Sequence, residues 1–262
     1  ALDDMANYYT EADKTRQQMI TAMMYPMIIL VLATAVIVFV LIFVVPRFTD
    51  IYASMDGAKI PAFTQMVMDV STYLQKNIFI ILGVIAAVVV IFKLLYDNVK
   101  AFKTITQWFL MHLPVFGNVI IYNEVTMFTK TFASLLKHNV FITDSMEILN
   151  KVTNNEIYKM LILDTVSNLA HGEKLSLAFQ NHWAFPIPAY EMLVTGEKTG
   201  QLPEMMQKVS EYYQELHKNA VTRIKTFVEP VLIIFLTVIV GIIVLSIVIP
   251  MFSLYNSIQQ QG

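Results

Sequence analysis

The stretch EPVLIIFLTVIVGIIVLSIVIPMF, from Glu229 to Phe252, decides the class of this protein. No Asp, Glu, Lys, Arg or His occurs between Pro230 and Ser257. A helix needs about 20 mostly apolar residues to cross a hydrocarbon core ~30 Å thick, at ~1.5 Å per residue. The stretch is longer than that, so it predicts a membrane-spanning helix.

Two further charge-free stretches, Pro26–Val45 and Ile78–Phe92, point the same way. The second reaches the required length only if Lys93 snorkels and the next residues complete the helix. The chain is 56% hydrophobic and 15% charged, whereas a soluble domain carries roughly 25% charged residues. We therefore predict an all-α membrane protein with three transmembrane helices, at residues 26–46, 78–97 and 229–250.

The positions of the basic residues predict how the chain is oriented, because short loops rich in Lys and Arg tend to stay in the cytoplasm. Basic residues lie before the first span, after the second and before the third: Lys14, Arg16, Lys93, Lys100, Lys103, Lys218, Arg223 and Lys225. Residues 1–25 and 98–228 are thus expected in the cytoplasm. The loop 47–77 and the C-terminal tail 251–262 are expected on the other side.

The chain also resembles itself. When Tyr8-Tyr9 is aligned with Tyr212-Tyr213, Pro26 falls on Pro230 and Pro46 falls on Pro250. Any two apolar spans look alike, but that does not explain the Tyr-Tyr pairs or the prolines at matching positions. Such self-similarity indicates an internal duplication. Residues 1–25 would then be the end of a first cytoplasmic domain with its stalk helix, and we expect the rest of that domain before residue 1.

Residues 98–228 show apolar side chains at helical spacing throughout, which predicts a bundle of about six short helices. Asn139 can adopt the left-handed conformation that ends a helix. Thr143 or Asp144 can cap the next helix. The expected helices cover residues 125–136, 157–169, 175–180 and 186–194, with Met146, Leu149 and Val152 facing inward. The side chains of Phe141 and of Ile187–Tyr190 could form a partner surface, but core positions are favoured.

The motif GEKTGQLPEMMQKVSEYY, Gly196–Tyr213, lies between two of these helices. Gly196 can end one helix in a left-handed turn. Thr199 or Gln201 can cap the next, and Pro203 suits its first turn. The apolar stripe of that next helix is Leu202, Met206, Val209, Tyr213 and Leu216.

This helix can continue into the membrane as a stalk, which we define as residues 202–228. Pro230 lacks an amide hydrogen and favours a kink at membrane entry, as Pro26 would in the first copy. Glu229, beside Pro230, is expected to be an interfacial carboxylate rather than a functional contact. Tyr25 stands at the equivalent position of the first copy.

The sequence lacks several patterns that enzymes and cofactor sites require. In a Walker loop, G-x-x-x-x-G-K-[ST], the lysine follows the second glycine, whereas Lys198 lies between Gly196 and Gly200. The five histidines have no metal-ligand spacing, and the chain has no cysteine. The formal net charge of −2 does not indicate nucleic-acid binding. We expect no enzymatic activity, no cofactor and no metal.

Several motifs, in order, resemble one family: the polytopic inner-membrane platform proteins of type IV pilus and type II secretion machines. They are LPVFGN (Leu113–Asn118), FTKTFASLLKHNVFITDSMEI (Phe128–Ile148), HGEKLSLAF (His171–Phe179) and the terminal span. The most specific match is to the family signature Gly-Glu-x-x-Gly-x-Leu, at Gly196, Glu197, Gly200 and Leu202. Asn139 stands where the family usually has glycine.

The resemblance implies a multi-pass protein of the bacterial cytoplasmic (inner) membrane that lacks the family's first cytoplasmic domain here. It implies coupling of a cytoplasmic assembly ATPase to the insertion of pilin or pseudopilin subunits into a filament. It also implies contacts with other inner-membrane assembly proteins, self-association and no catalysis. The signature residues, with Tyr212 and Tyr213, would form the coupling turn and stalk. An oligomeric small transporter or channel is the alternative, and the charge-free spans disfavour it.

Overall fold

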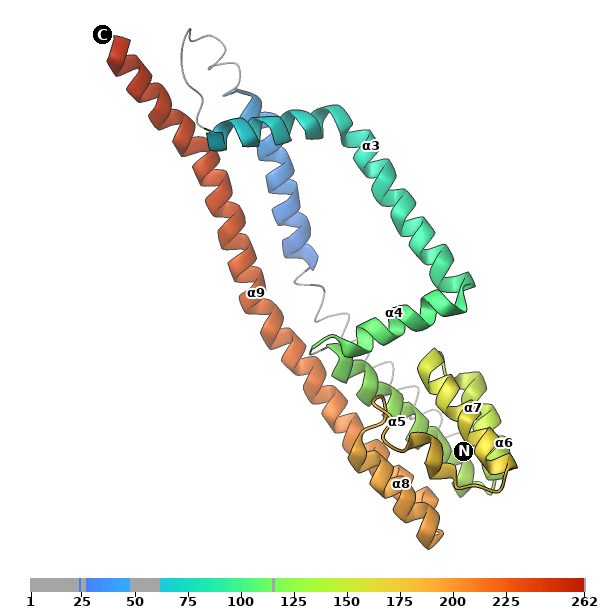
Figure 1. Cartoon of the computed structure of the whole chain (residues 1–262). Coiled ribbons are helices and arrows are strands. Elements are labelled where there is room, and N and C mark those ends of the chain that lie inside the picture. The colour runs from blue at the N-terminus through green and yellow to red at the C-terminus, as the bar shows by residue number, and fades with distance from the viewer. Residues whose placement is uncertain (1–23, 25–26, 48–61, 115, 262) are drawn as a thin grey trace. The chain divides into compact units, whose positions relative to one another are not determined.

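A computed structural model describes residue 24 and residues 27–47, 62–114 and 116–261. The chain divides into two compact units. Of the described residues, the first, which we call the bundle unit, contains 93–114 and 116–225, and the second, the span unit, contains 24, 27–47, 62–92 and 226–261. Within the described residues every regular element is helical and there is no strand, so the all-α prediction is confirmed (Figure 1).

Three described helices are long and apolar enough to cross a membrane: Met27–Arg47, Gln65–Asn98 and Leu202–Ile242. Their large apolar side chains, such as Phe79, Val88 and Ile234, are exposed on the isolated chain. Continuous exposed apolar surface of this kind is stable in lipid and not in water. The prediction of an α-helical membrane protein with three spans is therefore confirmed.

The second span belongs to α3 (Ala62–Asn98), which begins well before the predicted span at residues 78–97. Residues 62–77, which were expected in a loop, are helical. Polar residues such as Gln65 and Asp69 interrupt the apolar run but are compatible with a helix, whose backbone hydrogen bonds are all internal. Which part of α3 crosses the bilayer stays a prediction. Residues 48–61 lie outside the described part.

The first span contains a π-helical turn, η1 (Val40–Val44), which is tied to the start of α3. A π turn offsets backbone carbonyls from the regular helical pattern. Ser71 Oγ donates to the carbonyl of Leu41, and Gln75 Nε2 donates to the carbonyl of Ile42 at 3.3 Å. Val45 and Met68 are buried together beside this turn. Two polar side chains therefore fix the pairing of the first span with α3.

The bundle unit consists of α4 (Lys100–His112), α5 (Phe116–Lys137), α6 (Ile142–Val152), α7 (Glu156–Ala170), the 3₁₀-helix η2 (Leu175–Phe179), α8 (Ile187–Thr199) and the start of α9 (Leu202–Gln261). Its core is rich in aromatic rings: Phe128 lies 5.1 Å from Phe179, and Phe179 lies 4.6 Å from Phe185, between ring centroids. Tyr158 is fully buried and donates its hydroxyl to the carbonyl of Ala184 at 2.6 Å. The predicted helical bundle is thus present, with α4 as an additional helix.

The turn between α5 and α6 confirms one prediction and corrects two. Asn139 has φ 60°, the predicted left-handed conformation. Neither Thr143 nor Asp144 caps α6, because the helix begins at Ile142 after Phe141, and Asp144 lies in its first turn. Met146 and Leu149 are buried as predicted, but Val152 is exposed. Phe141 and Ile187 are exposed too, so their expected core positions are wrong.

Candidate functional site: the α8–α9 corner

The signature glycines form the corner between α8 and α9, and they have different roles. Gly200 ends α8 in the left-handed region, at φ 72°, and its amide donates to the carbonyl of Gly196. The next amide, of Gln201, reaches the same carbonyl at 3.0 Å. The left-handed turn expected at Gly196 therefore lies at Gly200, and the earlier prediction is wrong on this point.

Gly196 lies inside α8, buried against the first turn of α9. A Cβ atom at this position would lie 3.1 Å from the Cα of Leu202 and 3.1 Å from the Cβ of Met205. Contacts that short are tighter than packed side chains normally make. Gly196 is thus the residue that lets the backbones of α8 and α9 approach closely.

Glu197 links this corner to η2, which precedes it by some 20 residues. Its Oε1 accepts a hydrogen bond from the backbone amide of Leu175 at 2.6 Å. Its Oε2 accepts from the hydroxyl of Ser176 at 2.5 Å and from the amide of Ser176 at 3.4 Å. The carboxylate satisfies amides at the start of η2, where a helix has no internal acceptors for them. Two of the motifs that resemble the family are therefore joined by one side chain.

The start of α9 carries the predicted apolar stripe into the core. Leu202, Met206, Val209 and Tyr213 are buried, and Leu216 packs at the edge. Gln201 immediately precedes the helix, so capping by its side chain stays a prediction, and Pro203 lies in the first turn as predicted. Thr199 remains in α8, where its hydroxyl donates to the carbonyl of Thr195 at 2.8 Å.

The Tyr212-Tyr213 pair divides between core and surface. The ring of Tyr213 is buried 5.6 Å from that of Tyr122, whereas Tyr212 is exposed. Burial raises the pKa of Tyr213 to about 12, so this hydroxyl stays neutral. Tyr213 thus anchors the stalk in the bundle unit, and Tyr212 is available at its surface.

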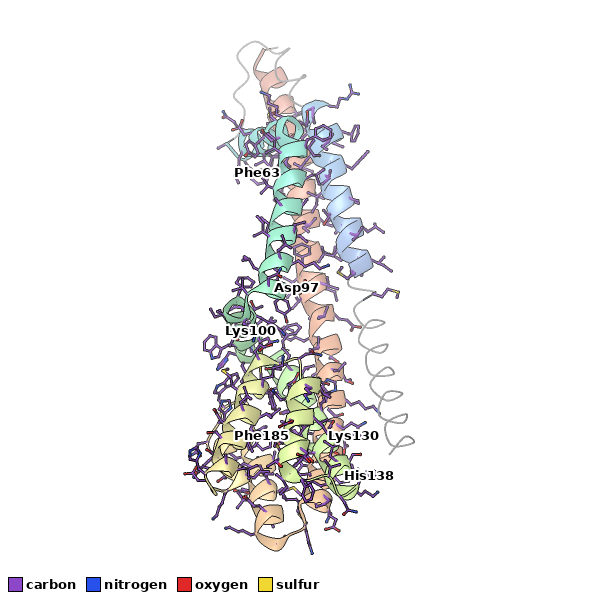
Figure 2. The ribbon with its side chains drawn as sticks, turned by 90° about the vertical axis from the view of Figure 1, so that its right-hand side faces the viewer. Phe63, Asp97, Lys100, Lys130, His138 and Phe185 are labelled. Atoms are coloured by element: carbon purple, nitrogen blue, oxygen red, sulfur yellow. The ribbon has the colours of Figure 1, made fainter. Side chains whose placement is uncertain are left out.

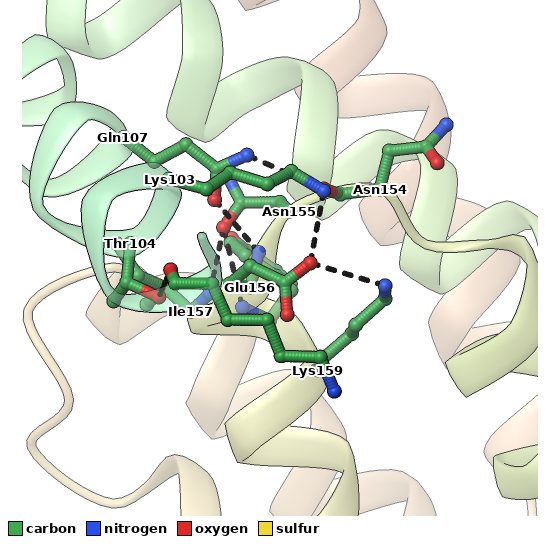
Figure 3. A network of polar contacts seen from close by, with 10 residues as sticks. Lys103, Thr104, Gln107, Asn154, Asn155, Glu156, Ile157 and Lys159 are labelled. Atoms are coloured by element: carbon green, nitrogen blue, oxygen red, sulfur yellow. Dashed lines mark hydrogen bonds and ion pairs between the residues drawn. The ribbon is translucent and has the colours of Figure 1, made fainter. Parts of the chain in front are cut away.

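A polar network joins α4 to the start of α7 (Figure 3). Lys103 Nζ lies 2.9 Å from Glu156 Oε1, and Lys159 Nζ lies 3.2 Å from the same atom. Gln107 Oε1 accepts from the amide of Glu156 at 2.8 Å. The hydrogen bond from Lys103, reinforced by Lys159, holds the pKa of Glu156 below its ordinary value. These contacts fix α4, the first helix after α3, on the rest of the bundle.

Asn155 completes this junction from a buried position. Its Oδ1 caps α7 by accepting from the amides of Ile157 at 3.0 Å and Tyr158 at 3.3 Å. Its Nδ2 approaches the sulfur of Met111 at 3.4 Å. A Cβ on Gly117 would lie 2.1 Å from the carbonyl oxygen of Met111, so only glycine fits at that position. The glycine in LPVFGN was the available signal for this close contact.

Glu124 on α5 is a partly buried acid, with a buried Oε2 atom, that the sequence reasoning missed. Its Oε2 has no hydrogen-bond partner within the described structure. Burial raises the pKa of this carboxyl to about 7. A lone Glu at helical spacing gives no sequence signal of burial, because its environment is set by the packing of other helices.

The residues expected at membrane entry are only partly described. Glu229 is exposed, and α9 continues through Pro230 without a break in its helical assignment. The boundary between the two units within α9 falls between Lys225 and Thr226. Pro230 cannot donate to the carbonyl of Thr226, the acceptor four residues earlier. The kink stays a prediction. Pro26 and Tyr8-Tyr9 lie outside the described residues, so the duplication also stays a prediction.

The described residues contain no group of three or more His, Cys, Asp or Glu side chains that could hold a metal ion. The corner combines three features: a close helix contact at Gly196, a left-handed turn at Gly200 and the Glu197 carboxylate. Because this carboxylate accepts hydrogen bonds from η2, we call it the Glu197 clamp.

Comparison with known families shows which proteins this chain resembles in sequence. The family model for type II secretion system (T2SS) protein F matches residues 1–46 and 128–250, which include the whole corner. The chain belongs to this family. The stretches of this chain that match the T2SS protein F family include both Tyr-Tyr pairs of the apparent repeat, Tyr8-Tyr9 and Tyr212-Tyr213.

Relatives of this T2SS protein F family member are named for type IV pilus assembly or for type II secretion. The type IV pilus assembly protein PilC of Pseudomonas aeruginosa is 30% identical over 255 residues, which cover 97% of this chain and 68% of the relative. PilC of Thermus thermophilus is 30% identical over 261 residues, covering 99% and 64%. The type II secretion system protein F of Xanthomonas campestris is 27% identical over 257 residues, covering 98% and 63%. The chain thus spans about two thirds of the length of these relatives.

Proposed function

We propose that the chain is the greater part of a platform protein in the bacterial cytoplasmic membrane. In this role it couples a cytoplasmic assembly ATPase to the insertion of pilin or pseudopilin subunits from the bilayer into a filament. Its own role is structural and not enzymatic. Family membership, with relatives named for type IV pilus assembly and for type II secretion, supports the setting.

The observation that carries the coupling proposal is the Glu197 clamp at the base of α9. α9 is assigned as one helix of 60 residues, from the signature corner at Leu202 to Gln261. Gly196 lets the first turn of this helix pack closely on α8, and Glu197, which lies on α8, joins α8 to η2. A helix held at one end transmits displacement of that end along its axis through its hydrogen-bonded turns, and Pro230 interrupts one of these bonds at the predicted kink. A partner that moves the corner would therefore move the stalk.

The proposed topology places residues 1–25 and 98–228 in the cytoplasm, where an ATPase could reach the corner. Residues 251–262 would lie on the far side of the membrane. The basic residues that flank the spans support this orientation. Self-association and contacts with other inner-membrane assembly proteins belong to the same proposal.

The test uses the full-length protein, expressed in its native host in place of the chromosomal copy. Glu197→Gln and Leu202→Ala are compared with Glu191→Gln, an exposed glutamate on the same helix α8. We expect the first two variants to reach the membrane at normal levels. Less ATPase should co-purify with them than with the wild type, and cells that carry them should assemble fewer filaments. Glu191→Gln should match the wild type. Normal assembly by variants whose corner is measurably destabilised would refute the coupling role.

A further inference from the structure

Helix α4 carries an apolar face that nothing in the described protein covers. Ile105 is 64% exposed, Trp108 49% and Phe109 57%. Their spacing of three and four residues places them on one side of the helix, together with His112. The ring centroid of His112 lies 4.3 Å from that of Trp108 and 4.3 Å from that of Trp183, which extends the patch beyond the helix.

The opposite side of α4 packs on α7. Lys103, Gln107 and Met111 follow one another at four-residue intervals and contact the Glu156 and Asn155 cluster described above. At about 100° per residue, the centre of this docked stripe lies about 150° around the helix from the centre of the exposed face. The docking contacts therefore fix the direction in which the exposed face points within the bundle unit.

If α3 crosses the membrane, its short connection to α4 would bring the start of α4 close to the bilayer surface. Only Val99 separates α3 from α4, with an extended backbone at φ −113° and ψ 101° (Figure 2 labels Asp97 and Lys100 on either side). The charge-free run of α3 ends before Lys93. Lys100 is three residues beyond Asp97, so it lies at most ~10 Å from it, at ~3.5 Å per residue.

The chemistry of α4 suits the boundary between lipid headgroups and acyl chains. The helix has 13 residues and spans ~20 Å along its axis, too short to cross the bilayer. It contains no Asp or Glu, so anionic headgroups would meet no like charge on it. Trp is enriched at this depth because its ring is apolar and its indole N–H is polar. Amphipathic helices with Trp and Phe on the apolar side bind such interfaces.

From the exposed face, the fixed docking and the short connection we propose that α4 lies in the membrane interface, with Ile105, Trp108 and Phe109 inserted among the lipids. The bundle unit would then touch the bilayer through α4 as well as through its connections to the spans. This inference requires that α3 crosses the membrane. It does not require the coupling role, so the two can fail separately.

The absence of cysteine from the chain allows a direct test with single spin labels. Ile105→Cys and Phe109→Cys are labelled with a nitroxide in the whole chain and reconstituted into vesicles of phosphatidylcholine and phosphatidylglycerol. Leu82→Cys, exposed in the apolar run of α3, is the lipid reference, and Glu147→Cys, exposed on α6, is the water reference. Power saturation then compares access to oxygen with access to a water-soluble nickel complex.

The labels at 105 and 109 should show oxygen access well above nickel access, with a ratio between those of the two references. A ratio equal to that at position 147 would show a water-exposed helix and overturn the proposal. Strong immobilisation with low access to both reagents would show a protein contact, such as a second copy, and would also overturn it.

Tryptophan fluorescence gives a second readout that needs no label, because the chain has two tryptophans. In Trp183→Phe, which retains Trp108, lipids brominated near the glycerol end of their acyl chains should quench the fluorescence. Lipids brominated near the chain ends should quench less. Unchanged fluorescence with both lipids would contradict insertion of Trp108.

Discussion

Glu197 Oε1 lies 2.6 Å from the backbone nitrogen of Leu175, so one carboxylate joins the α8–α9 corner to the start of η2. The same side chain accepts the hydroxyl hydrogen of Ser176. The Gly-Glu-x-x-Gly-x-Leu signature therefore has a packing role here. Its glycines shape the α8–α9 corner, and its glutamate joins that corner to η2.

Replacing Glu197 by Gln should destabilise the bundle unit. The Gln side chain keeps the shape, but it loses the charge and directs an amide group towards backbone donors. Hydrogen bonds to a charged group contribute about 1.5–3 kcal/mol, so a loss of about 1–3 kcal/mol in unfolding free energy is expected. Chemical unfolding of the purified chain in detergent measures this loss. Glu191→Gln is the control and should leave stability unchanged.

Gly196→Ala and Gly200→Ala should both destabilise, for different reasons. At 196 the added methyl meets the α9 backbone, and overpacking of this kind costs about 1–3 kcal/mol. At 200 there is open space, but the left-handed backbone costs an alanine about 1–2 kcal/mol. Asn tolerates that conformation, so Gly200→Asn should recover much of the stability, whereas Gly196→Asn should not. Thermal unfolding of the four variants distinguishes them, and equal rescue at both sites would contradict these roles.

Glu124 should make stability fall as pH rises. Its carboxyl has an ordinary pKa of 4.5 and a folded pKa of about 7, so the folded state binds more protons between these values. The contribution of Glu124 to stability is then fully present below pH 4.5 and is lost as the pH rises to about 7, by ~3 kcal/mol in total. Glu124→Gln should remove this decrease and be more stable than the wild type at pH 8.

The control for Glu124→Gln is Glu147→Gln, at an exposed position on α6. Unfolding of the three proteins at several pH values between 4.5 and 8 gives the comparison. A pH profile that is the same in wild type and Glu124→Gln would mean that another group is responsible.

Ser71 and Gln75 should hold the first span against α3 through the π turn. Val45 and Met68 are buried together, so a Val45→Cys/Met68→Cys pair should be joined efficiently by a short bismaleimide. Adding Ser71→Ala and Gln75→Leu removes the donors to the Leu41 and Ile42 carbonyls and should reduce the yield. Gel mobility measures it, and an unchanged yield would show that apolar packing alone sets the pairing.

Substitutions at Tyr212 and Tyr213 should distinguish an effect on stability from an effect on coupling. Tyr213→Ala empties a buried aromatic position, which costs about 3–5 kcal/mol. Tyr212→Ala changes an exposed ring and should leave unfolding free energy within about 0.5 kcal/mol. In the full-length protein, Tyr212→Ala should nevertheless lower filament assembly if the surface of the stalk meets a partner. Full assembly by this variant would remove Tyr212 from the coupling proposal.

The bundle helices were predictable because apolar spacing depends on the same core that the folded protein buries. Asn139 was predictable too, since few residue types adopt its left-handed conformation at low cost. The start of α3 was missed because hydropathy shows where a chain suits lipid and not where its helix begins. Lys76 and Asn77 bound the apolar run at its start, but α3 extends back through them to Ala62.

The corner was located correctly but its internal roles were not. A glycine within a helical pattern is compatible with a helix end or with a close helix contact, and sequence alone does not separate them. Gly196 and Gly200 differ in backbone conformation and in what lies beside them in space, and the sequence shows neither difference. The partner of Glu197 is more distant still in sequence, so its role depends on how η2 folds back against α8.

The most direct test of the central claim is purification of the tagged full-length protein from native membranes under mild detergent, with identification of the proteins that accompany it. The coupling account predicts an assembly ATPase together with pilin or pseudopilin subunits, and less of the ATPase from the Glu197→Gln variant. Recovery of neither class of partner by the wild-type protein would contradict the account.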